Sequence, residues 1–142
     1  MASAQPANSS TRKPCILLAE DDLDDFYFFQ LAMEKCAAEI KLVHAADGRE
    51  AILYLEDTAT PAPDLIVTDL KMPKINGFEL LEWLKQHPEL SKLPAVVFSS
   101  SDEATDRKRA KELGAKSYHV KPGNHRGFVE EVNRICSALL SQ

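Results

Sequence analysis

The sequence has few of the features that mark secreted, membrane-bound or nucleic-acid-binding proteins. Its 142 residues include only three cysteines and no CxxC pair, so neither a disulfide framework nor a thiolate metal site is indicated, and we expect reduced thiols in a core. No apolar run approaches the roughly 20 residues needed to cross a bilayer, and residues 1–13 lack the apolar segment of a secretory signal. The balance of 17 basic and 22 acidic residues also lacks the basic excess of a nucleic-acid binder. We therefore expect a cytoplasmic protein that binds neither membrane nor nucleic acid.

The sequence does contain an alternation of short apolar runs and longer helical patterns. Residues 1–13 are polar and aperiodic, which predicts a disordered tail, and residues 14–142 have the length of one domain. Five apolar runs predict strands: Cys15–Ala19, Lys41–Ala45, Leu65–Thr68, Ala95–Ser99 and Ser117–Val120. The segments between and after them predict helices: Leu23–Ala38, Gly48–Leu55, Phe78–Gln86, Ala104–Leu113 and Arg126–Leu140. Such an alternation predicts an α/β domain, a doubly wound parallel sheet with helices on both faces.

Polar residues stand at the carboxyl ends of these predicted strands, where open α/β sheets place their ligand sites. Glu20 and Asp21 follow the first strand, and Asp69 follows the third. Ser99 ends the fourth strand, and Lys121 follows the fifth. Converging carboxylates repel one another unless a cation lies among them, and oxygen ligands with open positions favour Mg²⁺. A carboxylate beside a metal, an amine and a hydroxyl suits phosphoryl transfer to that carboxylate.

The acids that follow Asp21 have a simpler interpretation. Asp22 stands where the N-cap of the first predicted helix is expected, and Asp24 and Asp25 would lie in its first turn. Negative charge there interacts favourably with the positive end of the helix. We therefore assign Asp24 and Asp25 to the helix terminus and leave Asp22 open between cap and site.

These residues lie in motifs that resemble the receiver domain of two-component response regulators. The matching motifs are ILLAEDD, LIVTDLKMPKINGFELL, PAVVFSSS and YHVKP. The resemblance covers about residues 14–140 and is nearest to the stand-alone receivers associated with phytochrome-type histidine kinases. It implies a flavodoxin-like (βα)5 fold with strand order 2-1-3-4-5. It also implies a phosphoprotein of a phosphorelay, not an enzyme, whose own reactions are self-catalysed phosphotransfer and autodephosphorylation.

The resemblance implies an acceptor and a metal site. Asp69 would be the phosphoacceptor for a phosphoryl group from a histidine kinase or a histidine phosphotransfer protein. Glu20, Asp21 and Asp69 would hold Mg²⁺, or Mn²⁺ in its place, together with the backbone carbonyl of Lys71. Gly77 would form the tight turn after the acceptor loop.

The resemblance also implies how the domain responds to phosphorylation. Lys121 would pair with a phosphoryl oxygen and would precede a cis bond to Pro122. Ser99 would turn toward the phosphoryl group, and Tyr118 would follow it as the switch aromatic. Their movement would alter the face built from the fourth helix, the fifth strand and the fifth helix, through which the chain would form a homodimer or reach its target.

The first predicted helix carries two sets of apolar side chains. One set has helical spacing and is assigned to the core: Phe26, Phe29, Met33 and Cys36. Tyr27, Phe28 and Leu31 lie off that stripe and predict a docking patch for the kinase or phosphotransfer partner. The alternative for Phe28 is packing against the last helix.

Three other functions were weighed on the residues. A phosphatase with an aspartate nucleophile usually places a second aspartate two residues later, where this chain has Lys71. A flavodoxin-like cofactor binder needs a phosphate-cradling loop after the first strand, where this chain has acids. A degenerate receiver that acts only as a protein-interaction module remains the alternative, although the set of acids, hydroxyl and lysine argues against it.

Overall fold

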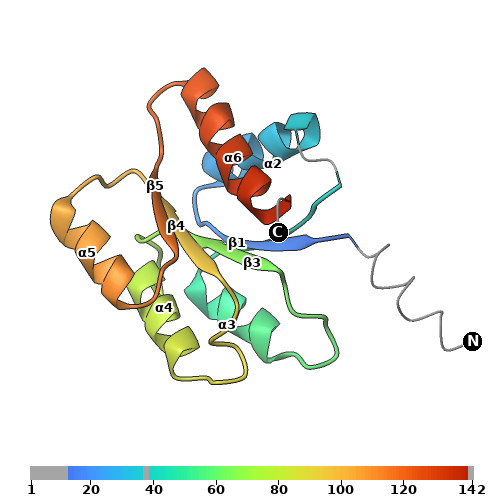
Figure 1. Ribbon diagram of the computed structural model, residues 1–142, viewed down its shortest axis with the longest axis vertical. Coiled ribbons are helices and arrows are strands. Elements are labelled where there is room, and N and C mark those ends of the chain that lie inside the picture. The colour runs from blue at the N-terminus through green and yellow to red at the C-terminus, as the bar shows by residue number, and fades with distance from the viewer. Residues whose placement is uncertain (1–12, 37–38, 141–142) are drawn as a thin grey trace, which may run out of the picture.

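The structure, a computed structural model, describes residues 13–36 and 39–140. It shows a five-stranded parallel sheet between two helical layers (Figure 1). The strands are β1 (Cys15–Ala19), β2 (Lys41–Ala45), β3 (Leu65–Thr68), β4 (Ala95–Ser99) and β5 (Ser117–Val120). The helices are α2 (Leu23–Cys36), α3 (Gly48–Glu56), α4 (Gly77–Lys85), α5 (Ala104–Glu112) and α6 (His125–Leu140).

The predicted fold class is confirmed, with the strand order β2-β1-β3-β4-β5. All five strands have their predicted bounds, and the helix ends differ from prediction by at most one residue wherever the comparison stays within the described residues. Residues 37–38 of the first predicted helix lie outside the described residues, as does all of the predicted tail except Lys13. None of the described helices is long and apolar enough to cross a membrane.

Two separate cores lie on the two faces of the sheet. Helices α2 and α6 cover one face, and α3, α4 and α5 cover the other (Figure 1). The first core is built around the aromatic side chains of Phe29, Phe98 and Phe128, and the second is mainly aliphatic. Cys15 and Cys136 are buried, as predicted, whereas the side chain of Cys36 lies outside the described residues. Burial of β1, β3 and β4 on both faces explains their nearly continuous apolar sequences.

The strand register brings the polar residues to one edge of the sheet. Ala19 pairs with Thr68, and the Asp69 N–H donates to the Ala19 carbonyl at 3.0 Å. Ser99 pairs with Val120, and the Lys121 N–H donates to the Ser99 carbonyl at 2.8 Å. The first residues after β1, β3 and β5 therefore emerge beside one another, as the sequence predicts.

Helices begin at this same edge because polar caps follow the strands. Asp22 accepts hydrogen bonds from the backbone N–H groups of Asp24 at 2.9 Å and Asp25 at 3.1 Å, which starts α2. Asp47 caps α3, and Asn76 forms a capping box at the start of α4. The predicted cap at Asp22 is confirmed, and it fixes the backbone directly behind the acidic residues of the edge.

Candidate functional site

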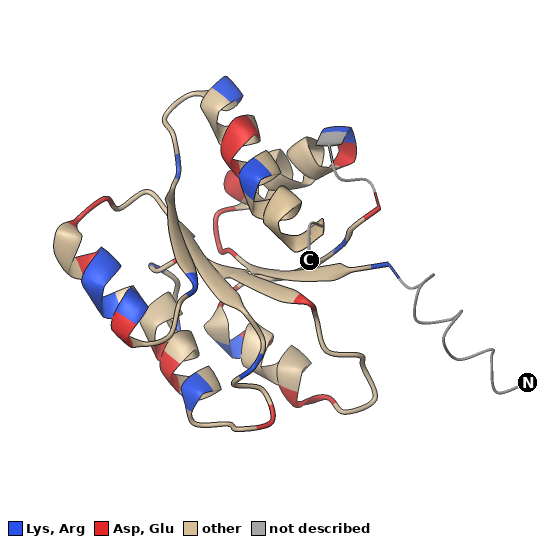
Figure 2. Cartoon of the chain, in the orientation of Figure 1, with Lys and Arg blue, Asp and Glu red and all other residues tan. Residues whose placement is uncertain are grey.

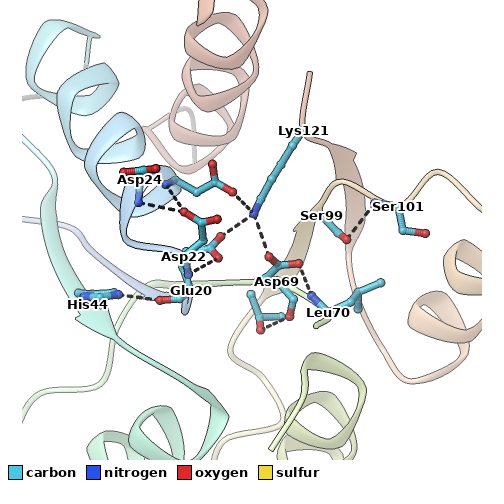
Figure 3. Close-up of polar contacts among 11 residues, drawn as sticks. Glu20, Asp22, Asp24, His44, Asp69, Leu70, Ser99, Ser101 and Lys121 are labelled. Atoms are coloured by element: carbon cyan, nitrogen blue, oxygen red, sulfur yellow. Dashed lines mark hydrogen bonds and ion pairs between the residues drawn. The ribbon is translucent and has the colours of Figure 1, made fainter. Parts of the chain in front are cut away.

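The Lys121 ammonium lies at the centre of a cluster of carboxylates. Its Nζ donates to Glu20 Oε1 at 2.7 Å, to Asp25 Oδ2 at 2.7 Å and to Asp69 Oδ2 at 2.8 Å. The Lys121 side chain is only 8% exposed. Figure 3 shows it reaching from the end of β5 between Glu20 and Asp69. Residues 101 positions apart in the sequence are thus joined by one ion pair.

Three carboxylates of the site are close enough to share one cation. Ligand oxygens of Glu20, Asp21 and Asp69 all lie within 4.8 Å of one another. Glu20 is buried, Asp21 is exposed and Asp69 lies between these extremes, so the cluster opens toward solvent on the Asp21 side. An all-oxygen set with an open side fits a hard divalent cation. The three predicted carboxylate ligands therefore fit a divalent metal site.

The electrostatics of the cluster are set by burial and by the balance of charge. Burial, and next the neighbouring Asp69 carboxylate, raise the pKa of Glu20 to about 7 against the opposing effect of Lys121. Burial alone would lower the pKa of Lys121, but the carboxylates of Asp69 and Glu20 outweigh it and hold that pKa above its ordinary value. Lys121 is therefore a permanent cation, and Glu20 is the group of the cluster whose charge responds to neutral pH.

A second group of side chains lies on the other side of Asp69. Ser99 is buried, and its Oγ accepts a hydrogen bond from the Ser101 N–H at 3.2 Å. The Tyr118 hydroxyl donates to the Ser101 carbonyl at 2.8 Å, and the Arg107 guanidinium lies 4.9 Å from the Tyr118 ring centre. Figure 3 shows Ser99 beside Asp69 but bonded toward Ser101. The two predicted switch residues are thus linked through one loop residue.

The loop after Asp69 is closed by contacts at both ends. The Gly77 N–H donates to the Leu70 carbonyl at 2.9 Å, and the Gly48 N–H donates to the Ile75 carbonyl at 3.1 Å. A Cβ atom at Gly77 would lie 2.1 Å from the Asp69 carbonyl oxygen, and one at Gly48 would lie 2.4 Å from the Ile75 carbonyl oxygen. Both distances are far below van der Waals contact, so glycine is required at both positions. This agrees with the tight turn predicted at Gly77.

An open groove with a volume of about 600 Å³ runs beside the acceptor loop. Asp21 and Lys71 line it together with Phe78 and Arg109, and the Arg109 guanidinium lies 4.2 Å from the Phe78 ring centre. Figure 2 shows that lysine and arginine residues gather on α5, which forms one wall. The groove is therefore lined by charges of both signs, with Asp106 beside Arg109 on the α5 wall.

Comparison with known proteins agrees with this geometry. Residues 16–133 match the response regulator receiver domain family. The chain belongs to this family. The response regulator Rcp1 of Synechocystis sp. is 30% identical over 138 residues, which cover 94% of each chain.

Solved structures show the same fold. The phosphorylated cyanobacterial phytochrome response regulator RcpA is 32% identical, with a TM-score of 0.86 over 92% of this chain and 96% of that one. The Mn²⁺-bound form of Rcp1 is also 32% identical, with a TM-score of 0.81 over 87% of this chain and 92% of that one. The receiver thus resembles two single-domain relatives along nearly their whole length.

The predicted docking residues of the receiver lie on α2 with unequal exposure. Tyr27 is 54% exposed and Phe28 is 38% exposed, whereas Leu31 is half-buried. The Phe28 ring also contacts the Phe128 ring of α6, with 6.2 Å between their centres. Phe28 therefore packs against the last helix and still presents part of its ring to solvent.

Two residues of the site escaped the sequence analysis. Asp25 was assigned to the helix terminus, yet it contacts Lys121. His44 hydrogen-bonds through Nε2 to the Glu20 carbonyl at 2.8 Å, and its ring stacks on Phe26 at 3.9 Å. Helical spacing does not relate Asp25 to Asp21, because α2 begins only at Leu23. No signal in the sequence pointed to the contact of Asp25 with Lys121 or to His44.

One expectation about the Lys121–Pro122 bond is wrong. None of the peptide bonds between described residues is cis. The trans form is the intrinsically preferred one for a bond that precedes proline, and Lys121 reaches all three carboxylates from it.

Proposed function

We propose that this receiver accepts a phosphoryl group on Asp69 from a phosphohistidine of a sensor histidine kinase or a histidine phosphotransfer protein. An Asp69 carboxylate oxygen attacks phosphorus, the phosphorus–nitrogen bond breaks, and the imidazole leaves with the electron pair. The observation that carries this proposal is the Lys121 ammonium held 2.8 Å from Asp69 inside the carboxylate cluster. There its positive charge can stabilise the negative charge that develops on the phosphoryl oxygens.

The proposal assigns the divalent cation to Mg²⁺ and its ligands to Glu20, Asp21, Asp69 and the backbone carbonyl of Lys71. A bound Mg²⁺ would supply positive charge that, together with that of Lys121, neutralises the entering phosphoryl group. The clustering of the three carboxylates supports the ligand set, and the Mn²⁺-bound relative supports a divalent ion. Asp21 also lines the open groove, which gives a donor access to the acceptor.

The proposed output is a change in the surface formed by α5, β5 and α6. A phosphoryl group adds about 1.5 to 2 negative charges and three acceptor oxygens, and the Ser99 hydroxyl lies beside Asp69 on the side away from Lys121 (Figure 3). If Ser99 turns to it, the Ser101 N–H loses its acceptor, and the Tyr118 contact with Ser101 changes with it. This surface would form the homodimer or bind a target, or the phosphoryl group would pass to a further histidine.

The proposed partner is a histidine kinase, of the phytochrome type as the name of the relative RcpA suggests. Tyr27, Phe28 and Leu31 on α2 would form the docking patch for it. The proposal treats residues 14–142 as one receiver domain and places it in the cytoplasm, where such kinases present their phosphohistidine.

The test is intact mass after incubation with Mg²⁺ and acetyl phosphate, with Asp69→Asn alongside. We expect the mass of one phosphoryl group in the parent protein only, and its loss when EDTA removes Mg²⁺. The parent protein could also gain no mass from acetyl phosphate or from a phosphorylated kinase while it is folded and loaded with metal. That result would favour a protein-interaction module over a phosphoacceptor. A gain in both proteins would show that the acceptor is a residue other than Asp69.

A further inference from the structure

Lys121 has no spare hydrogen-bond donor in this structure. A lysine ammonium carries three N–H groups, and Glu20, Asp25 and Asp69 each accept one at 2.7–2.8 Å. A phosphoryl oxygen can therefore bind Lys121 only after one of these acceptors gives way. The three acceptors differ in what phosphorylation and metal binding do to them.

Two of the three acceptors change their chemistry during the proposed reaction. Asp69 forms a bond to phosphorus and loses its negative charge as a carboxylate. Glu20 lies within the cluster whose oxygens can share a cation, so a bound cation competes with Lys121 for its charge. Asp25 is not among the residues of that cluster. It is the acceptor that keeps both its charge and its partner throughout.

The backbone at Asp25 is also held in place. Its N–H donates to Asp22 Oδ1 at 3.1 Å, and the neighbouring Phe26 N–H donates to the Asp22 carbonyl at 3.0 Å. The Asp25 side chain starts from the first turn of α2 and reaches the ammonium from the solvent side, since it is 29% exposed whereas the Lys121 side chain is 8% exposed. A short side chain on a capped helix turn makes a rigid anchor.

We propose that Asp25 is a positioning residue, which anchors the Lys121 ammonium beside the acceptor while Asp69 and Glu20 turn to the phosphoryl group and the metal. Without this anchor, Lys121 would lose its remaining fixed contact at the step in which it must bind a phosphoryl oxygen. The inference rests on the proposed function of Asp69, and it assigns Asp25 a role that differs from stabilising the helix terminus.

Asp24 offers a matched control for Asp25. It lies in the same first turn of α2, carries the same charge, donates its N–H to the same Asp22 carboxylate at 2.9 Å and is exposed to solvent. Asp25→Asn and Asp24→Asn therefore remove the same charge from the same helix end. Any effect on helix stability or on the general field of the site should be similar in both variants.

The first measurement is the rate of phosphorylation by acetyl phosphate at saturating Mg²⁺. We expect Asp25→Asn to react about tenfold more slowly than Asp24→Asn, as for loss of one charged hydrogen bond that orients a donor. The Mg²⁺ affinity should agree between the two variants, and Asp25→Glu should recover part of the rate. Equal rates in the two asparagine variants would overturn the proposal. A faster rate in Asp25→Asn would also overturn it, because Asp25 would then compete with the phosphoryl group for Lys121.

The second measurement does not depend on phosphorylation. The ¹⁵N-detected NMR signal of the Lys121 ammonium, assigned by its absence in Lys121→Arg, reports whether the group is held in slow exchange. We expect it to broaden beyond detection in Asp25→Asn and to persist in Asp24→Asn, both with Mg²⁺ present. A signal that persists in both variants would overturn the proposal that Asp25 anchors Lys121. A parent protein that takes no phosphoryl group would instead overturn the proposed function, and the NMR signal would still test the role of Asp25.

Discussion

The two sides of Asp69 differ in how they are connected to it. On one side Lys121 is bonded directly to Asp69 and to two further carboxylates. On the other side the hydroxyls of Ser99 and Tyr118 are bonded to the loop residue Ser101 and to no atom of Asp69. The first side already carries its positive charge beside the acceptor, although one of its three hydrogen bonds must pass to the phosphoryl group. The second side is held toward Ser101 and makes its first contact only with the phosphoryl group.

This difference separates the chemistry of the receiver from its signal. A positive charge that already lies beside the acceptor lowers the barrier to phosphoryl transfer, because only one of its hydrogen bonds has to pass to a phosphoryl oxygen. A hydroxyl that must first leave Ser101 costs free energy, so it responds to the phosphoryl group after transfer and converts it into a surface change. Substitutions on the two sides of Asp69 should therefore alter different measurements.

The largest effect is expected from Lys121→Ala, which removes the centre of the charged side. The rate of phosphorylation should fall by about 10²–10³-fold, as when one preorganised donor is removed. The metal-free protein should lose about 3–5 kcal/mol of stability, because three carboxylates are left without their buried partner. Mg²⁺ should bind more tightly, because the competing ammonium is gone.

Lys116→Ala is the control for this variant, because Lys116 is exposed just before β5, at the opposite end of that strand. Stopped-flow phosphorylation, chemical denaturation and Mg²⁺ titration of both variants give the three measurements. Weaker Mg²⁺ binding in Lys121→Ala would contradict the idea that the ammonium and the cation compete for the same carboxylates.

The next effect concerns pH and again belongs to the charged side. Glu20 has a pKa of about 7 in the folded, metal-free protein, so it is protonated and uncharged below this value. Mg²⁺ should therefore bind more weakly as the pH is lowered, with an affinity about tenfold lower at pH 6 than at pH 8. Isothermal titration at the two pH values measures this difference. Glu20→Gln should bind Mg²⁺ weakly and without this dependence between pH 6 and pH 8.

The stability of the metal-free protein should depend on pH in the opposite direction, because of the same Glu20 carboxyl group. The ordinary pKa of the group is 4.5, so the folded protein holds this proton more tightly than the unfolded chain does. Stability should decline as the pH rises from about 4.5 through 7, and saturating Mg²⁺ should reverse the decline near pH 7. Denaturant midpoints of the parent protein and Glu20→Gln across this range measure it.

The smallest effect is expected from Tyr118→Phe, on the hydroxyl side. The variant loses the hydrogen bond to the Ser101 carbonyl and keeps the ring beneath Arg107, so stability should fall by about 1 kcal/mol. Phosphorylation should slow far less than in Lys121→Ala, whereas binding to a partner of the α5–β5–α6 surface should change. A rate as low as that of Lys121→Ala would erase the distinction between the two sides.

The sequence predicted the parts of this molecule that depend on local pattern. Apolar runs bounded by polar residues gave the strands their limits, and the residues after those limits marked Glu20, Asp69 and Lys121 as neighbours at one edge. The partner of a long side chain depends on the angle at which helices and strands meet, which no local pattern contains. For this reason Asp25 was assigned to a helix terminus, although its carboxylate lies 2.7 Å from the Lys121 ammonium.

The closed loop after Asp69 has a fixed base and an exposed tip. The Gly77 N–H bonds to the Leu70 carbonyl and the Gly48 N–H bonds to the Ile75 carbonyl, at contacts that leave no room for a Cβ atom. These contacts hold the base of the loop beside the acceptor, whereas Lys71, Pro73 and Lys74 are exposed. Substitutions at the exposed tip can therefore tune access to the acceptor without moving it.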